Sequence, residues 1–248
     1  MKVNELFDKF NTLFDVDNQE WYDNSGAQIT FGDEDVFGVF VSLDATPGSA
    51  KRAVEAGANV LLTHHPLYFG SGSFLYAEDP NGMTTAVAYN SKLSIYSAHT
   101  CFDILALNEH VARLIGMENL TRLTEREGYI GDIRSCTLLE YGKLVSRALE
   151  EDGIRVCGDN ERTVSRVAFI NGSGGRDEEM IKHAVKAGAD VFVSSEFKHS
   201  VIRFALDLGC AVIDVSHMKS ELPFVALAGK MLEDNYGIHV VLDGETNL

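Results

Sequence analysis

Cysteine is scarce in this sequence. Among 248 residues, no two cysteines form a C-x-x-C pair, and their spacings indicate no disulfide framework. A free cysteine is commonly buried and behaves as a small hydrophobic residue. We therefore interpret all four as core residues: Cys101, Cys136, Cys157 and Cys210.

Positive charge and long apolar runs are also scarce. The net charge is -16 and the sequence pI is about 4.8. This balance disfavours nucleic acid or an anionic membrane as the main partner, because phosphate binding needs clustered Lys and Arg. A phosphorylated ligand is still compatible with it, since a bound metal can reverse the local charge.

The sequence also lacks the signals of export or membrane insertion. No apolar run approaches the ~20 residues of a membrane helix. The segment Met1–Glu5 has no signal-peptide core. We therefore expect a soluble, cytoplasmic protein.

Hydrophobic residues make up 45% of the chain, enough for a substantial core. Their spacing predicts alternating helices and strands. The predicted helices cover residues 3–14, a short segment ending at Gly57, 105–115, 138–150 and 224–232. The predicted strands include 36–43, 60–63 and 238–242.

An internal repeat relates the two halves. V-E-A-G-A-N-V-L-L-T (54–63) matches V-K-A-G-A-D-V-F-V-S (185–194) at an offset of 131. Each copy reads as a helix end, a glycine at the C′ position and a short strand. Ordinary β-α-β sequences could produce this match alone. Both copies, however, later end in His-x-x-x-acid, at His99 with Asp103 and at His217 with Glu221.

The His-x-x-x-acid ends of the two copies are 118 residues apart, whereas the preceding segments are 131 apart. The first copy therefore carries 13 additional residues between these two features. Gly70–Gly82 has that length and the composition of a loop, either a flap over the site or an inert surface loop. The repeat predicts an α/β protein with two similar units and mostly parallel sheets. We place the first unit at 1–125, with 222–248 able to pack against it, and the second at 126–221.

Histidine and carboxylate residues gather where ligands collect, beyond the carboxyl ends of parallel strands. Neutral imidazole and carboxylate suit Zn, Mn or Fe. Five such side chains exceed the three that one catalytic zinc uses, but fit two ions if a carboxylate bridges them. The alternative is a set of hydrogen-bonded core histidines. The five are His64, His65, Asp103, His217 and Glu221, and we expect one dinuclear site between the two units.

The adjacent histidines impose a condition on this site. On a regular strand, His64 and His65 would point to opposite faces. They can serve one cluster only if the strand has ended and the chain turns, which the following Pro66 favours.

The motifs resemble those of a known family. T-H-H-P-L-Y-F (63–69), S-A-H-T-C-F-D (97–103) and S-H-M-K-S-E (216–221) resemble motifs of the GTP cyclohydrolase I type 2-like family, also called Nif-three-like. W-Y-D-N-S-G (21–26), N-G-S-G-G (171–175) and S-S-E-F-K-H (194–199) extend the resemblance over nearly the whole chain, in the short form without an inserted middle domain.

The resemblance implies a dinuclear metal site, with the five residues above as ligands, and a homohexameric toroid. Three positions depart from the family pattern: Cys101 replaces Asn, while Ser195 and Ser216 replace Gly. None of the three is a ligand. They flank the site, so they bear on the identity of the substrate.

Other candidates have weaker support. His99 could orient Asp103 or be a core histidine. Glu196 aligns with His65 in the repeat, so Glu196 and the nearby His199 could transfer protons or contact substrate, or simply form a solvated strand end. Glycines 172, 174 and 175 could admit a phosphate, but we favour a plain turn, since no Walker or Rossmann fingerprint surrounds them.

Three functions follow from these patterns. The resemblance implies a metal-dependent hydrolase that uses two divalent ions (Zn, Fe or Mn) to open the guanine imidazole ring of GTP, with Glu196 or His199 as proton shuttle. A second hypothesis is a metal-binding regulatory or delivery protein without turnover. A third is a structural protein with internal histidines. Metal analysis would eliminate the third, and an assay with nucleotides would separate the first two.

Overall fold

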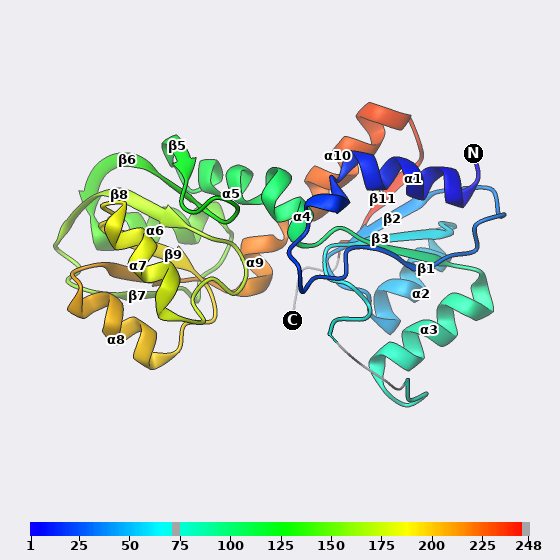
Figure 1. Cartoon of the computed structure of the whole chain (residues 1–248), viewed down its shortest axis with the longest axis horizontal. Helices are drawn as coiled ribbons and strands as arrows, with labels where there is room; N and C mark the ends of the chain where they lie inside the picture. The colour runs from blue at the N-terminus through cyan, green and yellow to red at the C-terminus, as the bar shows by residue number, and fades with distance from the viewer. Residues whose placement is uncertain (71–74, 245–248) are drawn as a thin grey trace. The chain divides into compact units, whose positions relative to one another are not determined.

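The computed structural model describes residues 1–70 and 75–244 and contains two compact units (Figure 1). One unit comprises Met1–Leu105 with Phe224–Leu248, and the other comprises Ala106–Pro223. The sequence placed the boundaries at 125 and 221. Residues up to 125 include β5 (Glu118–Arg122), but this strand pairs with β6 (Tyr129–Thr137) and so belongs to the second sheet.

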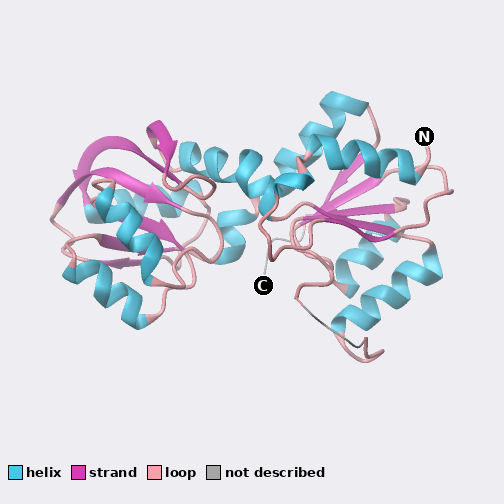
Figure 2. Ribbon diagram, in the orientation of Figure 1, coloured by secondary structure: helices cyan, strands magenta, loops and turns pink. Residues whose placement is uncertain are grey.

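The first unit is built on a five-stranded sheet with the order β1-β4-β3-β2-β11. Four of its strands run parallel, and β1 is antiparallel to β4 at one edge. Figure 2 shows this sheet between layers of helices. The strands are β1 (Gly26–Ile29), β2 (Val39–Ser42), β3 (Val60–Thr63), β4 (Ser94–Ser97) and β11 (Val240–Leu242).

Helices cover both faces of this sheet. Figure 1 shows α1 and α10 on one face and α2 and α3 on the other. The predicted apolar stripe of α1 is confirmed, because Val3, Leu6, Phe7 and Phe10 are buried. The elements are α1 (Val3–Leu13), the 3-10 turn η1 (Val16–Asn18), α2 (Pro47–Glu55), α3 (Pro80–Ser91), α4 (Thr100–Phe102) and α10 (Pro223–Tyr236).

The loop predicted at Gly70–Gly82 ends earlier than predicted, because α3 begins at Pro80. Residues 71–74 lie outside the described part of the chain, and Pro80–Gly82 form the first turn of α3. Proline is favoured at the first helical position because its fixed φ suits the helix. The N–H that it lacks would have no intrahelical acceptor at that position in any case. The helix start was predicted as loop because residues 79–82 are of types common in loops.

The second unit contains a six-stranded sheet with the order β5-β6-β8-β9-β10-β7. Strands β8, β9 and β10 are parallel, whereas β5, β6 and β7 add antiparallel pairings at the sides. The remaining strands are β7 (Arg155–Cys157), β8 (Thr163–Phe169), β9 (Val191–Ser194) and β10 (Ala211–Asp214). The helices are α5 (Asn108–Leu114), α6 (Leu138–Ala148), α7 (Glu178–Lys186), α8 (His199–Asp207) and α9 (His217–Glu221).

The internal repeat is visible in the elements themselves. Helix α7 begins and ends 131 residues after α2. Strand β9 likewise begins and ends 131 residues after β3. Gly57 and Gly188 follow these helices with φ of 75° and 82°, the left-handed conformation expected of a C′ glycine. The predicted α/β fold with two similar units is confirmed, and antiparallel strands flank the parallel core of the second.

One predicted helix begins earlier than expected. The sequence indicated a helix over 105–115, but the chain is already helical at Thr100, in α4. A π-helical turn, η2 (Asp103–Leu107), joins α4 to α5. Such turns are frequent at functional sites. This one begins at Asp103, a predicted metal ligand.

Candidate metal centre

His64 and His65 stand where β3 ends and the chain turns. The backbone N–H groups of both donate to the carbonyl oxygen of Leu43, at 3.1 and 3.0 Å. Two consecutive residues therefore face one acceptor instead of alternating along a strand ladder. The ring centroids lie 5.0 Å apart. The turn that the two adjacent histidines required is present.

Hydrogen bonds fix which ring nitrogen of each histidine carries the hydrogen. Nδ1 of His64 lies 3.0 Å from the carbonyl oxygen of Ala98, and Nδ1 of His65 lies 2.8 Å from Oδ1 of Asp44. A carbonyl or carboxylate oxygen only accepts, so Nδ1 carries the hydrogen in both rings. In the neutral ring the lone pair is then on Nε2, as in metal-binding histidines that are oriented by an acceptor.

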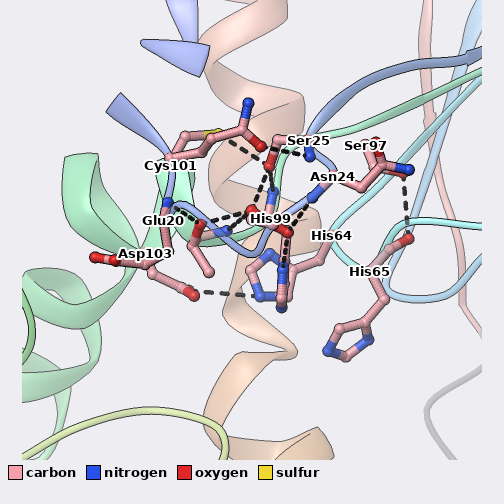
Figure 3. Close-up of polar contacts among 12 residues, drawn as sticks. Glu20, Asn24, Ser25, His64, His65, Ser97, His99, Cys101 and Asp103 are labelled. Carbon is pink, nitrogen blue, oxygen red and sulfur yellow. Dashed lines mark hydrogen bonds and ion pairs between the residues drawn. The ribbon is translucent and has the colours of Figure 1, made fainter. Parts of the chain in front are cut away.

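Asp103 adds a carboxylate to the first unit. It starts η2 one helical turn after His99, and its backbone N–H donates to the carbonyl oxygen of His99 at 3.1 Å. Its Oδ1 lies 3.4 Å from Nε2 of His64, as Figure 3 shows. An imidazole lone pair beside a carboxylate oxygen is an arrangement that a cation stabilises.

His99 lies beside His64 and His65, and it is oriented by Asp23, a residue of the motif W-Y-D-N-S-G. Its Nδ1 lies 2.7 Å from Oδ1 of Asp23. The other oxygen of Asp23 accepts hydrogen bonds from the Ser25 hydroxyl and from the backbone and hydroxyl of Thr100. Burial raises the pKa of Asp23, but the hydrogen bonds from His99, Thr100 and Ser25 outweigh it and hold this pKa well below its usual range. Asp23 is therefore a carboxylate that orients His99.

In the second unit, His217 and Glu221 lie at the two ends of α9. The side chain of Ser216 caps this helix by accepting from the Lys219 N–H at 3.1 Å. One helical turn brings Nε2 of His217 to 2.9 Å from Oε2 of Glu221. Glu221 is only 2% exposed, and Nδ2 of Asn171 lies 3.5 Å from its Oε1. The His-x-x-x-acid spacing thus brings an imidazole and a buried carboxylate together.

Glu196 contacts the ring of His217. Its Oε1 lies 2.7 Å from Nδ1 of His217, and Nε of Arg176 donates to its Oε2 at 2.7 Å. Burial raises the pKa of Glu196, yet these bonds and the charge of Arg176 lower it overall. Glu196 therefore positions His217 as Asp44 positions His65. The proton-transfer role predicted for Glu196 stays a prediction, as does that of His199, the exposed first residue of α8.

The glycines of N-G-S-G-G make room for this carboxylate. Gly172 has a φ of 59°, and a Cβ there would lie 2.3 Å from Oε1 of Glu221. Its N–H donates to the Ser220 hydroxyl at 3.0 Å, and the N–H of Gly175 donates to the Ser195 carbonyl at 3.0 Å. Both amides already have acceptors within the protein. This favours the turn over the phosphate loop.

The three departures from the family pattern have local roles. The Ser195 hydroxyl donates to the carbonyl oxygen of Gly172. Ser216 caps α9. The Cys101 thiol lies 3.5 Å from the Ser25 hydroxyl, in the loop that carries Asp23. Each of them supports a neighbour of the predicted ligands.

The chain matches one family along nearly its entire length. Residues 1–247 match the family description Duf34/NIF3 (NGG1p interacting factor 3). The chain belongs to the Duf34/NIF3 family. The resemblance inferred from the motifs is thereby confirmed.

Relatives agree with this membership. A protein from Clostridium perfringens named "GTP cyclohydrolase 1 type 2 homolog" is 25% identical and aligns over 94% of this chain and 92% of its own length. A protein from Helicobacter pylori strain J99 named "GTP cyclohydrolase 1 type 2" is 27% identical over 94% and 93%. A Bacillus cereus protein related to NIF3 has a similar structure, with a TM-score of 0.88, 18% identity and coverage of 98% and 97%. That identity supports the fold alone.

The donor chemistry fits a metal of the predicted kind. Each histidine described above presents its Nε2, since an oxygen acceptor occupies its Nδ1. The donor atoms of His64, His65 and His99 lie within 4.8 Å of one another and could hold an ion. Nitrogen and carboxylate donors without thiolate suit Zn, Fe or Mn better than Mg or Ca. The number and identity of the ions stay predictions.

In the part of the chain that the structure describes, every helix falls short of the length and apolarity needed to cross a membrane.

Proposed function

We propose that this Duf34/NIF3 member is a metal-dependent hydrolase that opens the guanine imidazole ring of GTP. The observation that carries the proposal is the common orientation of the histidines, each fixed through Nδ1 with its Nε2 presented. A histidine with only a structural role can bond through either nitrogen. The name of the Helicobacter pylori relative supports the substrate.

The proposed ligands come from both units. His64, His65 and Asp103 would contribute from the first, and His217 and Glu221 from the second. When bound, two divalent ions would supply Lewis acidity that activates water and stabilises developing negative charge. In the reaction, one water adds at C8 and the imidazole ring opens to a formamide. A second water then releases formate.

The chain's own residues hold the donors and move protons. Asp44 and Glu196 orient His65 and His217 through their Nδ1 atoms. The depressed pKa of Glu196 makes it a weak proton acceptor, which favours His199 for the shuttle. His199 has the exposure that a group exchanging protons with water needs.

Formate release from GTP tests the activity directly. The purified protein would be loaded in turn with Zn, Fe and Mn, its metal content measured, and formate quantified from GTP, ATP and GDP. The proposal predicts formate from GTP only when metal is present, and none after chelation. A metal-loaded protein that leaves all three nucleotides intact would favour the second hypothesis, a metal-binding regulatory or delivery protein.

A homohexamer and a cytoplasmic location complete the proposal. The family resemblance supports the first, and the charge and hydropathy of the sequence support the second. Sedimentation at micromolar concentration would test the assembly. A species at the monomer mass of 27.2 kDa would contradict it.

A further inference from the structure

Two adjoining loops of the first unit present exposed aromatic side chains. Trp21, in the loop before β1, is 91% exposed, and Phe69, in the segment after β3, is 58% exposed. Single apolar residues on a surface are common, but these two stand at the end of the sheet where ligands collect in α/β proteins. Their rings leave apolar surface in water at that end, which an apolar ligand would cover.

Hydrogen bonds hold the two loops against each other and against His99. Nδ2 of Asn24 donates to the carbonyl oxygen of Tyr68 at 2.7 Å, directly before Phe69 in the chain. The backbone N–H of His99 donates to the Ser25 hydroxyl at 3.0 Å, and Figure 3 shows Asn24 and Ser25 beside His99. The loop that carries the exposed tryptophan is therefore anchored at both the histidine and the second aromatic segment.

Phe69 also contacts His99 directly. The two ring centroids lie 5.6 Å apart and the ring planes are perpendicular, at 90°. In such a T-shaped pair the edge of one ring meets the face of the other. More than half of Phe69 nevertheless remains exposed. A planar ligand that packs on this exposed surface would lie next to the histidines of the candidate metal centre.

A purine base has the chemistry that both features require. It is flat, it stacks on aromatic rings through its π face, and this stacking tolerates different substituents. Stacking also needs no cationic side chain, which suits a chain with a net charge of -16. A second copy of the chain could cover the same rings. The contact between Phe69 and His99 favours an occupant small enough to reach the metal centre.

We propose that Phe69 stacks on the guanine base of the substrate and that Trp21 borders the bound base from the adjoining loop. This inference rests on the proposed function, because it takes GTP as the substrate. Phe69 would bind the six-membered and imidazole rings together and so hold the imidazole ring beside His99. Loss of a stacking aromatic residue typically weakens the binding of a base about 5–150-fold.

Binding of 7-deaza-GTP to the metal-loaded protein tests the inference without turnover. This analogue keeps a flat base but lacks N7, so its ring cannot open by the proposed reaction. Trp21 is the only tryptophan of the chain, and we expect saturable quenching of its fluorescence by 7-deaza-GTP and none by tripolyphosphate. Isothermal titration would give the affinity independently.

Three variants separate stacking from general apolar contact. Phe69→Leu keeps an apolar side chain without a π face, so it should weaken 7-deaza-GTP binding about 5–150-fold at unchanged metal content. Phe69→Tyr should retain the wild-type affinity. Phe37→Leu is the matched control, since Phe37 is 67% exposed but precedes β2 at the other end of the sheet. Phe69→Leu should also reduce the preference for 7-deaza-GTP over CTP, whose smaller base stacks less.

The outcomes distinguish this inference from the proposed reaction. Equal affinity of Phe69→Leu and wild type for 7-deaza-GTP would overturn the inference, as would the absence of binding. Formate release with an unchanged KM for GTP in Phe69→Leu would overturn it while the proposed function stands. Binding that depends on Phe69, without formate release from GTP, would support it and contradict only the reaction. A changed sedimentation of Phe69→Leu at wild-type nucleotide affinity would assign the ring to a contact between copies of the chain.

Discussion

Glu196 lies 2.7 Å from Nδ1 of His217, although the repeat places it where the first unit has His65. The two units therefore use equivalent positions differently. In the first unit this position presents an imidazole, and in the second it presents a carboxylate that orients an imidazole from another segment. Glu196 also has a φ of 61°, a left-handed conformation uncommon for a residue with a side chain. Strain of this kind is often retained at functional sites.

Glu196→Gln should weaken metal binding about 10–100-fold, because the amide cannot replace the charge that orients His217. At saturating metal both ions should still bind. A fall in formate release from GTP of ~100-fold or more would then identify Glu196 as the proton shuttle, and wild-type release would leave that role to His199. Isothermal titration with Zn²⁺ would measure the first effect. Glu178→Gln, an exposed change on α7, is the matched control. Wild-type affinity in Glu196→Gln would show that the contact with His217 has no effect on the metal.

Gly172→Ala should lower both stability and metal affinity. Its Cβ would lie 2.3 Å from Oε1 of Glu221, so the carboxylate must move. Gly209→Ala is a matched control, since Gly209 has a φ of 78° and a Cβ there would have nothing within 4 Å. Both changes carry a backbone cost of about 1–2 kcal/mol.

Urea unfolding of the two glycine variants would separate the backbone cost from the clash. Gly172→Ala should be the less stable, and it alone should lose metal affinity. Equal stability and equal metal content in the two variants would contradict the close fit of Gly172 against Glu221.

Glu221→Gln should reduce the bound metal while the fold remains intact. The carboxylate has one oxygen 2.9 Å from Nε2 of His217 and the other 3.5 Å from Nδ2 of Asn171. Both oxygens are therefore held in place, as a bridging ligand requires, and an amide leaves only one oxygen donor. Elemental analysis should show fewer than two ions per chain. Unchanged metal content would refute the bridging role.

Much of the fold was accessible from the sequence because its signals are local. The stripe of α1 is read within one helix, and the repeat needs only the comparison of two short segments. The histidine pair follows its own strand directly. The residues that orient the histidine rings could not be predicted in this way, because they are distant in sequence from the histidines. Asp23 lies 76 residues from His99, and Glu196 lies 21 residues from His217. No periodicity connects residues at such separations.

The motif W-Y-D-N-S-G did contain a clue to Asp23. An aspartate in a motif without a metal-binding role is a candidate partner for a ligand, but the sequence does not say for which one. Asp44 was similarly visible at the end of β2, where polar residues gather beyond parallel strands. The beginning of α3 was misread for another reason: Pro80 was counted as a loop residue, whereas its position at N1 favours a helix.

Cys210 should give the second unit a pH-dependent stability. Burial is the main cause that raises its pKa from 9.0 to about 12 in the folded protein. A thiol whose pKa is raised by folding contributes stability that is fully present below the unfolded value and is lost as the pH rises through the folded value. The contribution should therefore be complete at about pH 8 and decline from about pH 9 towards pH 12.

Comparison with Cys210→Ala isolates this contribution. The cavity left by the missing sulfur should lower the free energy of unfolding of the variant at every pH, so the slope with pH carries the information. Between about pH 8 and pH 10, wild type should lose roughly 1 kcal/mol more than Cys210→Ala, as the shift from 9.0 to about 12 implies. Urea unfolding at each pH would measure the difference. Parallel slopes would mean that the thiol ionises as readily in the folded protein as in the unfolded chain, and that the hydrophobic core around Cys210 does not shield it from water.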